Sequence, residues 1–426
     1  MKKNILIISY AYPPLNDAGA QRPFAVAKHL NKEKYNITVI TCKNPNAVLG
    51  VNENFNDSLE NVNLIRVHSY VGGGVNNFKN SQTKGINFFG KIKRGIFKVG
   101  QWIMFPDKGM FWYPNVIKFL KKNNELISNT DYIFSTSPGV TNHRIALYVK
   151  KKNKNVKWIA DFRDFNYVEN WHKKIGIKSF LHKKLEKAII NQSSKLTFVT
   201  KTMQDAYQKF YPQFKDKMFS VYNGFDKEDF PNTSQNISEK LSFFYAGSFY
   251  NGLRSPLPFL QLLDKAFEEN LLNPKDIILQ IAGKVDEDMK LNMKSYKSYY
   301  CIEFLGNLPR TEVLKYMGKT TFLWLIVGNI KAHYQTIPIK LFEYIAARRP
   351  ILNFAPKESE PSKIIEEKKL GCNINTLNYS FDENYAKFKN LLLEYKNGLY
   401  KDYMPIENLN SFSWKNQINI VEKLLV

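Results

Sequence analysis

A lysine and a glutamate three residues apart, just after a proline, are the residues of this chain best suited to bind a nucleotide. The segment 336–350 reads TIPIKLFEYIAARRP, and it predicts a loop through Pro338 followed by a helix with Lys340 and Glu343 near its start. A helix N-terminus offers unpaired amide donors and partial positive charge to a diphosphate, Lys340 adds a mobile cation, and a carboxylate such as Glu343 accepts both hydroxyls of a ribose. The segment also fits an ordinary surface helix, because short motifs match by chance.

Length and composition indicate a soluble protein of two domains. The chain has 426 residues, too many for one compact core, and 44% of them are hydrophobic and 23% charged. Its three cysteines, Cys42, Cys301 and Cys372, are odd in number and widely spaced, which argues against a disulfide framework and for a reducing compartment. The apolar run 4–9 is too short for a signal peptide, so we expect a first strand and a cytoplasmic protein.

The formal net charge of +24 has three explanations: nucleic acid, an anionic membrane surface, or a lysine-rich composition. Nucleic-acid binding is disfavoured because the sequence has neither zinc-finger spacing nor a helix-turn-helix signature. From 86 to 105, apolar residues recur every three or four positions, with Trp102 at the edge of that face and Lys91, Arg94 and Lys98 opposite it. This pattern predicts a helix lying in the lipid headgroup layer, peripheral on the inner face of the cell membrane, although its glycines weaken helix propensity.

A second basic segment, 173–188, carries Ile177, Leu181, Leu185 and Ala188 on one helical face. For both basic segments, the alternative is a surface helix whose apolar face packs on the core.

Strands and helices alternate along the chain, which predicts two doubly wound parallel sheets in Rossmann-like domains. We expect an N-terminal domain at 1–222, a linker at 223–240 where apolar periodicity stops, a C-terminal domain at 241–408, and a terminal segment at 409–426 that contains the last helix. The expected strands of the first domain are 5–9, 37–41, 62–67, 132–135, 158–161 and 195–199. Those of the second are 241–246, 277–282, 302–305, 321–327 and 351–354.

Ligands of open α/β sheets bind at the carboxyl ends of the strands, so functional residues are expected in strand-to-helix loops facing a cleft between the two domains. The loop after the first strand, 10–20, contains small residues, including Gly19, that permit close approach of the backbone to a ligand. It is not a dinucleotide fingerprint, because no Gly-x-Gly-x-x-Gly follows the strand.

Six short motifs occur in the order seen in glycosyltransferase family 4, which this chain resembles over nearly its whole length. They are 10–22 with two prolines and Gly19, 136–138 followed by His143, 161–164, 223–226, 245–248 and 340–350. The resemblance implies a GT-B fold with an acceptor-binding N-terminal domain, a nucleotide-sugar-binding C-terminal domain, and a last helix that crosses back to the first domain. It also implies a metal-independent enzyme without a cofactor that retains anomeric configuration.

Carried over residue by residue, the resemblance assigns donor binding to the C-terminal domain. Glu343 matches the second acid of the Glu-x7-Glu pattern and is expected to bind ribose, whereas Thr336 stands where the first acid is missing. Ser248 replaces the usual arginine, so Arg254 and Lys340 are expected to neutralise the departing diphosphate. Asn307 and Leu308 resemble the base pocket, with uridine as the default base. The expected donor-binding set is Gly19, Gly247, Asn307, Leu308, Thr336, Ile337, Pro338 and Glu343.

The remaining assignments concern the first domain. The resemblance implies that His143 faces the transferred sugar, although a lone histidine here is also typical of a helix cap. The acceptor-side residues are expected to be Tyr12, Arg22, Arg163 and Asp164, with an internal ion pair as the alternative for the last two. No carboxylate pair of glycosidase character stands out.

The function expected is sugar transfer from a nucleotide sugar, by default a UDP-sugar, to a lipid-linked or polysaccharide acceptor at an anionic membrane surface. The missing first acid keeps open a catalytically silent sugar-nucleotide-binding protein. A sugar-nucleotide epimerase, which would release its product without an acceptor, is the other alternative.

Overall fold

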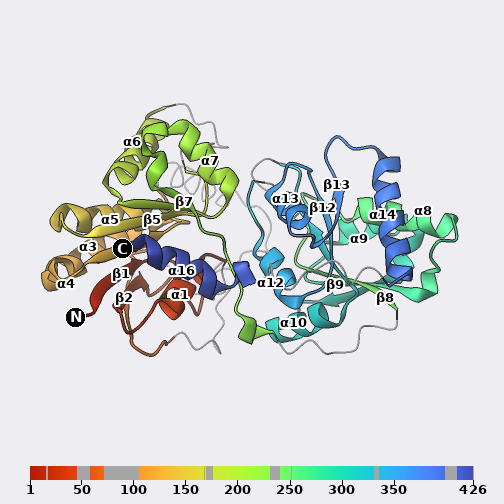
Figure 1. Cartoon of the computed structure of the whole chain (residues 1–426), viewed down its shortest axis with the longest axis horizontal. Coiled ribbons are helices and arrows are strands. Elements are labelled where there is room, and N and C mark those ends of the chain that lie inside the picture. The colour runs from red at the N-terminus through yellow and green to blue at the C-terminus, as the bar shows by residue number, and fades with distance from the viewer. Residues whose placement is uncertain are drawn as a thin grey trace, which may run out of the picture. The chain divides into compact units, whose positions relative to one another are not determined.

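The chain folds into two compact units, each built on one parallel sheet (Figure 1). The computed structural model describes residues 1–15, 18–45, 58–71, 105–166, 168, 176–230, 240–250, 252–330, 335–398 and 410–425. One unit comprises Met1–Tyr222 with Ile418–Val426, and the other comprises Asn223–Gln417. The prediction of two doubly wound parallel-sheet domains is confirmed.

The first unit contains a seven-stranded sheet in the order β3-β2-β1-β4-β5-β6-β7, with every pairing parallel. Its strands are β1 (Lys3–Ile8), β2 (Tyr35–Cys42), β3 (Val62–Val67), β4 (Tyr132–Thr136), β5 (Lys157–Phe162), β6 (Lys195–Phe198) and β7 (Met218–Ser220). Its helices include α1 (Ala18–His29), α3 (Tyr113–Lys122), α4 (Asn124–Ser128), α5 (Val140–Lys152), α6 (Ile177–Gln192) and α7 (Lys201–Phe210). Six of these strands were expected within one or two residues, and β7 was not, because three residues carry no readable periodicity.

The second unit contains a six-stranded sheet in the order β10-β9-β8-β11-β12-β13, again parallel throughout. Its strands are β8 (Leu241–Ala246), β9 (Ile277–Ala282), β10 (Ile302–Gly306), β11 (Phe322–Ile326), β12 (Ile351–Ala355) and β13 (Gly371–Asn375). Its helices include α8 (Leu257–Glu268), α9 (Glu287–Met293), α10 (Arg310–Lys319), α12 (Ile339–Ala347), α13 (Glu360–Glu367) and α14 (Phe381–Lys396). The edge strand β13 was missed because its sequence, GCNIN, has a single strongly apolar residue.

Burial explains why the central strands read as continuous apolar runs rather than alternating ones. Ile5–Ile8 of β1 and all five residues of β11 are buried, because helices cover both faces of a parallel sheet. Each unit has its own large apolar cluster, so each sheet is stabilised by burial within its own unit.

The segment expected as a linker, 223–240, is grouped with the second unit, and 231–239 lie outside the described residues. Phe225 accepts a backbone hydrogen bond from Trp414 at 2.9 Å and donates one to Phe412 at 3.2 Å, so this stretch is paired with the start of the last helix. That helix, α16 (Trp414–Leu425), lies where the sequence placed it. Its residues from Ile418 onward belong to the first unit, where Glu422 pairs with Lys34 at 3.0 Å, and Figure 1 shows it in blue among the red N-terminal elements.

Both sheets reverse their strand order at one point. In the first unit the chain moves outward from β1 to β3 and then returns to β4, which lies next to β1. In the second unit the corresponding neighbours are β8 and β11. Ligands of such sheets bind at the carboxyl ends of the strands beside this reversal. A ligand site in the second unit is therefore expected at the loops after β8 and β11.

Candidate functional site

The loops after β8 and β11 bring together most of the donor-side residues expected from the sequence. Gly247 follows β8 directly, and the loop after β11 leads to Pro338, the residue that precedes α12. Lys340 and Glu343 lie in the first turns of α12, and Arg254 follows β8 by eight residues. Two segments about a hundred residues apart in sequence therefore meet at the point where the sheet reverses.

Glycines let the strand ends approach one another closely. Gly247 (φ +140°) donates its backbone N–H to Ala282 at 2.8 Å, and Gly283 (φ +133°) donates to Gly306 at 2.7 Å. A Cβ on Gly283 would lie 2.2 Å from the Gly247 carbonyl oxygen, and one on Gly247 would lie 2.6 Å from Lys340 Nζ. At Gly283 a side chain would collide with backbone, and at Gly247 it would displace the Lys340 amine. Both positions also have a positive φ that other residues rarely adopt, so glycine is favoured at both.

Lys340 Nζ is buried without a hydrogen-bond partner in the part of the chain that the structure describes. It lies 4.4 Å from the centre of the Tyr245 ring, a cation–π distance, and packs against Gly247. Burial lowers the pKa of Lys340 to about 7, repulsion from Arg254 acts in the same direction, and Glu343 opposes both. An unpartnered amine next to a second cation leaves excess positive charge in the site, which suits an anionic ligand.

Arg254 supplies that second cation. Its guanidinium carbon lies 4.5 Å from the centre of the Tyr250 ring, and its Nε is buried with no hydrogen-bond partner among the described residues. Tyr245 lies between the two cations: burial raises its pKa to about 12, an effect that Arg254 partly opposes, and its hydroxyl donates to the Ser248 carbonyl at 2.9 Å. The Tyr245 hydroxyl is thus held in its neutral form at physiological pH.

Glu343 is held by an arginine that the sequence did not single out. Arg310, the first residue of α10, donates from Nη1 to Glu343 Oε1 and from Nη2 to Asp229 Oδ2, the latter at 3.2 Å. The Glu343 side chain is 18% exposed, whereas those of Arg310 and Asp229 are about half exposed. Arg310 follows Asn307 by three residues, so this ion pair joins the expected base-binding loop to the expected ribose carboxylate.

The other expected donor residues lie in the same unit. Asn307 is exposed and Leu308 half-buried in the loop after β10, which Gly306 (φ +64°) turns away from the sheet. Thr336 and Pro338 are half-buried before α12, while the side chain of Ile337 is buried, so only the backbone of Ile337 is available to a ligand. The first turn of α12 has no side-chain cap, which leaves amide donors of that turn open to an anion.

Two of the expected acceptor-side residues are buried in the first unit and cannot contact an acceptor as that unit stands. Arg22 is 1% exposed, and it forms a two-pronged ion pair with Asp161, at 2.9 Å from Nε and 2.7 Å from Nη2. Thr136 and Thr197 each donate a hydroxyl to Asp161 at 2.6 Å. Burial alone would raise the pKa of Asp161, but Arg22 and the two hydroxyls hold it below its usual value. Tyr12 is likewise 2% exposed, with its ring against Phe24.

His143 is a core histidine rather than a surface cap. It is fully buried on α5, its Nδ1 lies 2.8 Å from Ser135 Oγ, and its ring packs 4.9 Å from that of Phe162. Burial lowers its pKa to about 4, so it is neutral at physiological pH, although Asp161 opposes the shift. Contact with a sugar would require this part of the unit to open, so we assign His143 no ligand contact.

Three further expected residues lie near the first sheet's reversal. Arg163, half-buried after β5, donates from Nη1 to the carbonyl of Gly19 at 2.9 Å, while Asp164 beside it is exposed. Gly19, expected in the loop after the first strand, lies in the first turn of α1, so this bond fixes the start of α1 to the loop after β5 and uses the backbone of Gly19.

The expected membrane residues, Lys91, Arg94, Lys98 and Trp102, lie outside the described residues. The second basic segment is described from 176 onward, and its apolar face is divided: Leu185 and Ala188 pack against the core, whereas Ile177, Phe180 and Leu181 are 81%, 64% and 38% exposed. The alternative of a face wholly packed on the core is wrong for this end of α6. No helix in the described segments is long and apolar enough to cross a bilayer.

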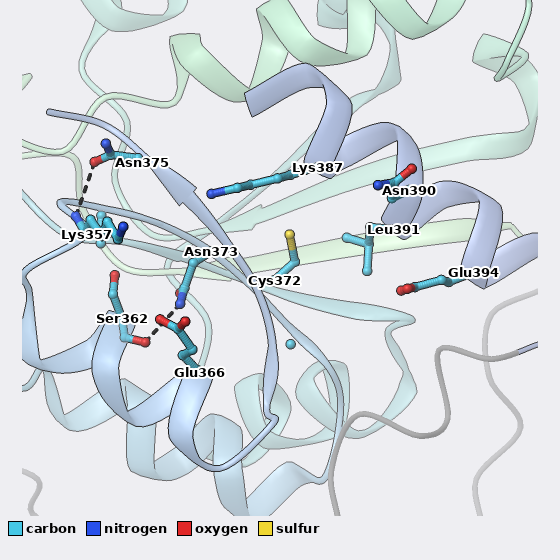
Figure 2. Close-up of a pocket in the computed structure, with 12 residues that line it drawn as sticks. Lys357, Ser362, Glu366, Cys372, Asn373, Asn375, Lys387, Asn390, Leu391 and Glu394 are labelled. Atoms are coloured by element: carbon cyan, nitrogen blue, oxygen red, sulfur yellow. Dashed lines mark hydrogen bonds between the residues drawn. The ribbon is translucent and has the colours of Figure 1, made fainter. Parts of the chain in front are cut away.

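A separate pocket of about 390 Å³ runs along the edge strand β13 (Figure 2). Asn373, Ser362, Asn375 and Lys357 line it and hydrogen-bond within it: Asn373 Nδ2 donates to the Ser362 carbonyl at 2.8 Å, and Lys357 N donates to Asn375 Oδ1 at 3.2 Å. None of the expected donor residues lines it, and β13 is the sheet edge opposite β10. We therefore place the candidate site at β8 and β11 and not in this pocket.

The fold has known counterparts. The structure superposes with TM-score 0.59 on sucrose-phosphate synthase from Thermosynechococcus elongatus (12% identity, covering 99% of this chain and 98% of that one). It matches WaaG, a glycosyltransferase involved in lipopolysaccharide biosynthesis, at 0.58 (14%, 98% and 99%). The fold is GT-B. A glycosyltransferase from Rickettsia africae gives a TM-score of 0.60 at 13% identity, over 100% of this chain and 98% of that one. No protein-family model and no curated protein sequence matches the chain.

Beyond the expected residues, Arg310, Asp229 and Tyr245 of the second unit lie around the candidate site. Tyr245 belonged to a recognised motif, but Arg310 and Asp229 carried no signal because their partners are distant in sequence. No group of three or more His, Cys, Asp or Glu residues that could hold a metal ion occurs within the described ranges.

Proposed function

We propose that this protein is a glycosyltransferase that moves a sugar from a nucleotide-sugar donor, by default a UDP-sugar, to a lipid-linked or polysaccharide acceptor. The observation that carries the proposal is the pair of cations Lys340 and Arg254, each with a buried, unpartnered nitrogen among the described residues, at the reversal of the second sheet. Excess positive charge beside an uncapped helix N-terminus fits a diphosphate leaving group. The fold shared with known glycosyltransferases is consistent with this activity.

In the proposed complex each residue has one task. Lys340, Arg254 and the first amides of α12 bind the diphosphate, Glu343 accepts the ribose hydroxyls, and the Asn307–Leu308 loop receives the base. Gly247 gives the donor room beside β8, and the backbone of 336–338 borders the sugar. Arg163 and Asp164 belong to the acceptor side.

The proposed reaction is a front-face displacement that retains configuration. The acceptor oxygen bonds to the anomeric carbon on the face from which the diphosphate departs. The electron pair of the broken C–O bond stays on the phosphate oxygen, which takes the acceptor proton. Lys340 and Arg254 stabilise the charge that develops on that oxygen, which is the main electrostatic requirement of a transferase that works without a metal.

A binding screen tests the donor assignment. We expect UDP-sugars to raise the melting temperature of the second unit, by roughly 5–10 °C at 100 times Kd, because a ligand of the native state adds about 2.7 kcal/mol there. GDP-, ADP- and CDP-sugars at the same concentration serve as comparisons, and differential scanning calorimetry is the measurement. If none of these ligands moves the transition, the assignment of a nucleotide-sugar site is wrong.

Thr336 favours a second candidate, a GT-B protein that binds sugar nucleotides without transferring them. A threonine there cannot make the charged contacts to the donor sugar that a carboxylate makes. Transfer of a radiolabelled sugar from the ligand found in the screen to endogenous lipid or glycan separates the two: binding without transfer supports the silent protein.

We also propose that the enzyme works attached to an anionic membrane surface on the cytoplasmic side. The formal charge of +24 favours such a surface, and α6 exposes Ile177, Phe180 and Leu181 at helical spacing beside the exposed Lys183, Lys184 and Lys187. Phe105, the last residue of the first basic amphipathic segment, packs its ring 4.9 Å from that of His182 on α6. Phe105, the described end of the first segment, therefore contacts α6.

Changing Ile177 and Phe180 to serine should weaken binding to phosphatidylglycerol vesicles at least tenfold, because both apolar side chains leave the bilayer interface. Changing Lys183, Lys184 and Lys187 to glutamine should weaken it about 100-fold, at ~1 kcal/mol per lysine, and remove most of its salt dependence. Lys91, Arg94 and Lys98 changed to glutamine should act in the same direction. Vesicle sedimentation measures each, and Leu291→Ser, an exposed apolar position on the second unit, is the control. Absent or salt-insensitive binding of the wild type would reject the membrane proposal.

A further inference from the structure

Arg310 links three segments that meet around the expected ribose carboxylate. It opens α10 immediately after the 307–309 loop, donates to Glu343 on α12, and donates to Asp229 in the 3-10 turn Lys227–Asp229. No family motif in the sequence pointed to it. Among the described residues, its ion-pair partners are these two carboxylates.

The ion pair with Arg310 occupies only part of the hydrogen-bonding capacity of the Glu343 carboxylate. Arg310 reaches Oε1 of Glu343 through a single nitrogen, Nη1, while its Nη2 is turned to Asp229. A carboxylate has about four acceptor positions on its two oxygens, so one N–H donor from the described residues leaves most of them open. The carboxylate is therefore fixed in orientation without being saturated, which is the state that a ribose diol needs.

The charged groups around Arg310 and Glu343 also favour a role for Arg310 in holding the Glu343 carboxylate. Burial alone would lower the pKa of Arg310, but Glu343 and Asp229 raise it above its usual value, so the guanidinium stays charged. Lys340 lies one helical turn before Glu343, so the carboxylate has cations on two sides. The proposed ribose acceptor therefore lies among basic side chains.

We propose that Arg310 is a positioning residue for the donor: it fixes the Glu343 carboxylate for the ribose hydroxyls, and Asp229 in turn fixes Arg310. The proposal rests on the proposed function, because it takes Glu343 as the ribose ligand. It adds a specific requirement, that the effect of Arg310 on binding passes through the two hydroxyls of the ribose. An arginine that merely neutralised the diphosphate would act on any nucleoside diphosphate alike.

The test compares UDP with 2′,3′-dideoxyuridine diphosphate by titration calorimetry on the full chain. We expect Arg310→Gln to weaken UDP binding about tenfold and to change binding of the dideoxy analogue less than twofold, because that analogue has no hydroxyls for Glu343. Glu343→Gln should show the same selective loss. Asp229→Asn, which loosens Arg310 without removing it, should weaken UDP binding about threefold with the same selectivity.

Two controls separate positioning from a general effect. Arg348→Gln removes an exposed arginine at the opposite end of α12 and should leave binding of both ligands unchanged. The double variant Arg310→Gln/Glu343→Gln should bind UDP no more weakly than Glu343→Gln alone, because Arg310 has no task once the carboxylate is gone. Thermal unfolding of every variant establishes that the unit remains folded.

The outcomes are distinct. If Arg310→Gln weakens both ligands equally, Arg310 contacts the diphosphate and the positioning role is wrong. If it strengthens UDP binding, Arg310 competes with the ribose for Glu343, and the role is reversed. If the wild-type protein binds no UDP, the assignment of the donor site is wrong. If Glu343→Gln selectively weakens UDP binding but Arg310→Gln has no effect, only the positioning role of Arg310 is wrong.

Discussion

Replacing Lys340 with methionine should lower kcat for sugar transfer about 100- to 1,000-fold, the usual loss when one group that stabilises transition-state charge is removed. Methionine keeps an unbranched apolar side chain in the space beside Tyr245 and Gly247, so packing is largely preserved. The measurement is transfer of a radiolabelled sugar with the donor found by the binding screen. Lys315→Met, an exposed lysine on α10 that pairs with Glu312, is the matched control and should keep full activity. Retention of more than a tenth of wild-type kcat in Lys340→Met would remove Lys340 from the catalytic role.

The pH dependence gives the same prediction a second readout. Because the pKa of Lys340 is lowered to about 7, the amine is largely neutral above that pH and must take up a proton to pair with the diphosphate. Wild-type affinity for a nucleotide sugar should therefore fall as pH rises from 7 to 9, and in Lys340→Met this dependence should disappear.

The effect of Lys340 on folding stability changes with pH in the opposite direction to its effect on donor affinity. The folded-state pKa is below the unfolded value of about 10.4, so the buried charge destabilises the fold fully below pH 7 and the cost disappears as pH rises toward 10. Lys340→Met should unfold at no lower temperature than wild type at pH 6. A large loss of stability there would show that the variant fails by unfolding rather than by losing a charge.

Asp161→Asn should destabilise the first unit by about 3–5 kcal/mol, because it removes the carboxylate charge from the buried two-pronged ion pair with Arg22. At roughly 2–4 °C per kcal/mol for a unit of this size, the melting temperature should fall by about 6–20 °C. Calorimetry that resolves the two units measures it, and the transition of the second unit serves as the internal control. The double variant Arg22→Met/Asp161→Leu removes both charges of the pair and should cost less than the single change, since apolar side chains replace the two ions together.

This stabilisation also depends on pH. The folded-state pKa of Asp161 is held below its usual value, so the contribution is present above about pH 4 and is lost as pH falls through the folded-state pKa. The difference in stability between wild type and Asp161→Asn should therefore be largest near neutral pH and shrink below pH 4. An equal deficit at pH 3 and pH 7 would mean that the ion pair is not its cause.

The sequence by itself determined most of the strands and their order along the chain. Continuous apolar runs such as 5–8 and 322–326 identify buried parallel strands, because a strand covered on both faces has no polar positions. The resemblance to glycosyltransferase family 4 singled out Gly247, Arg254, Lys340 and Glu343, and the structure brings these four residues to one unit and one sheet reversal. Hydrophobic periodicity was sufficient for the strands, whereas the four residues came from short motifs in chain order.

Only the tertiary structure decided which polar side chains are available to a ligand. Arg22 and His143 were expected to face ligands, yet one is buried against Asp161 and the other against Ser135 and Phe162. Arg310 and Asp229 were not expected at all, yet they hold Glu343. In these four cases the partner of the side chain lies 8 to 139 residues away in the sequence. The free energy of burying a charged or polar group depends on that partner. Residue type and spacing do not indicate which distant residue becomes the partner, so only the fold could show which charges pair.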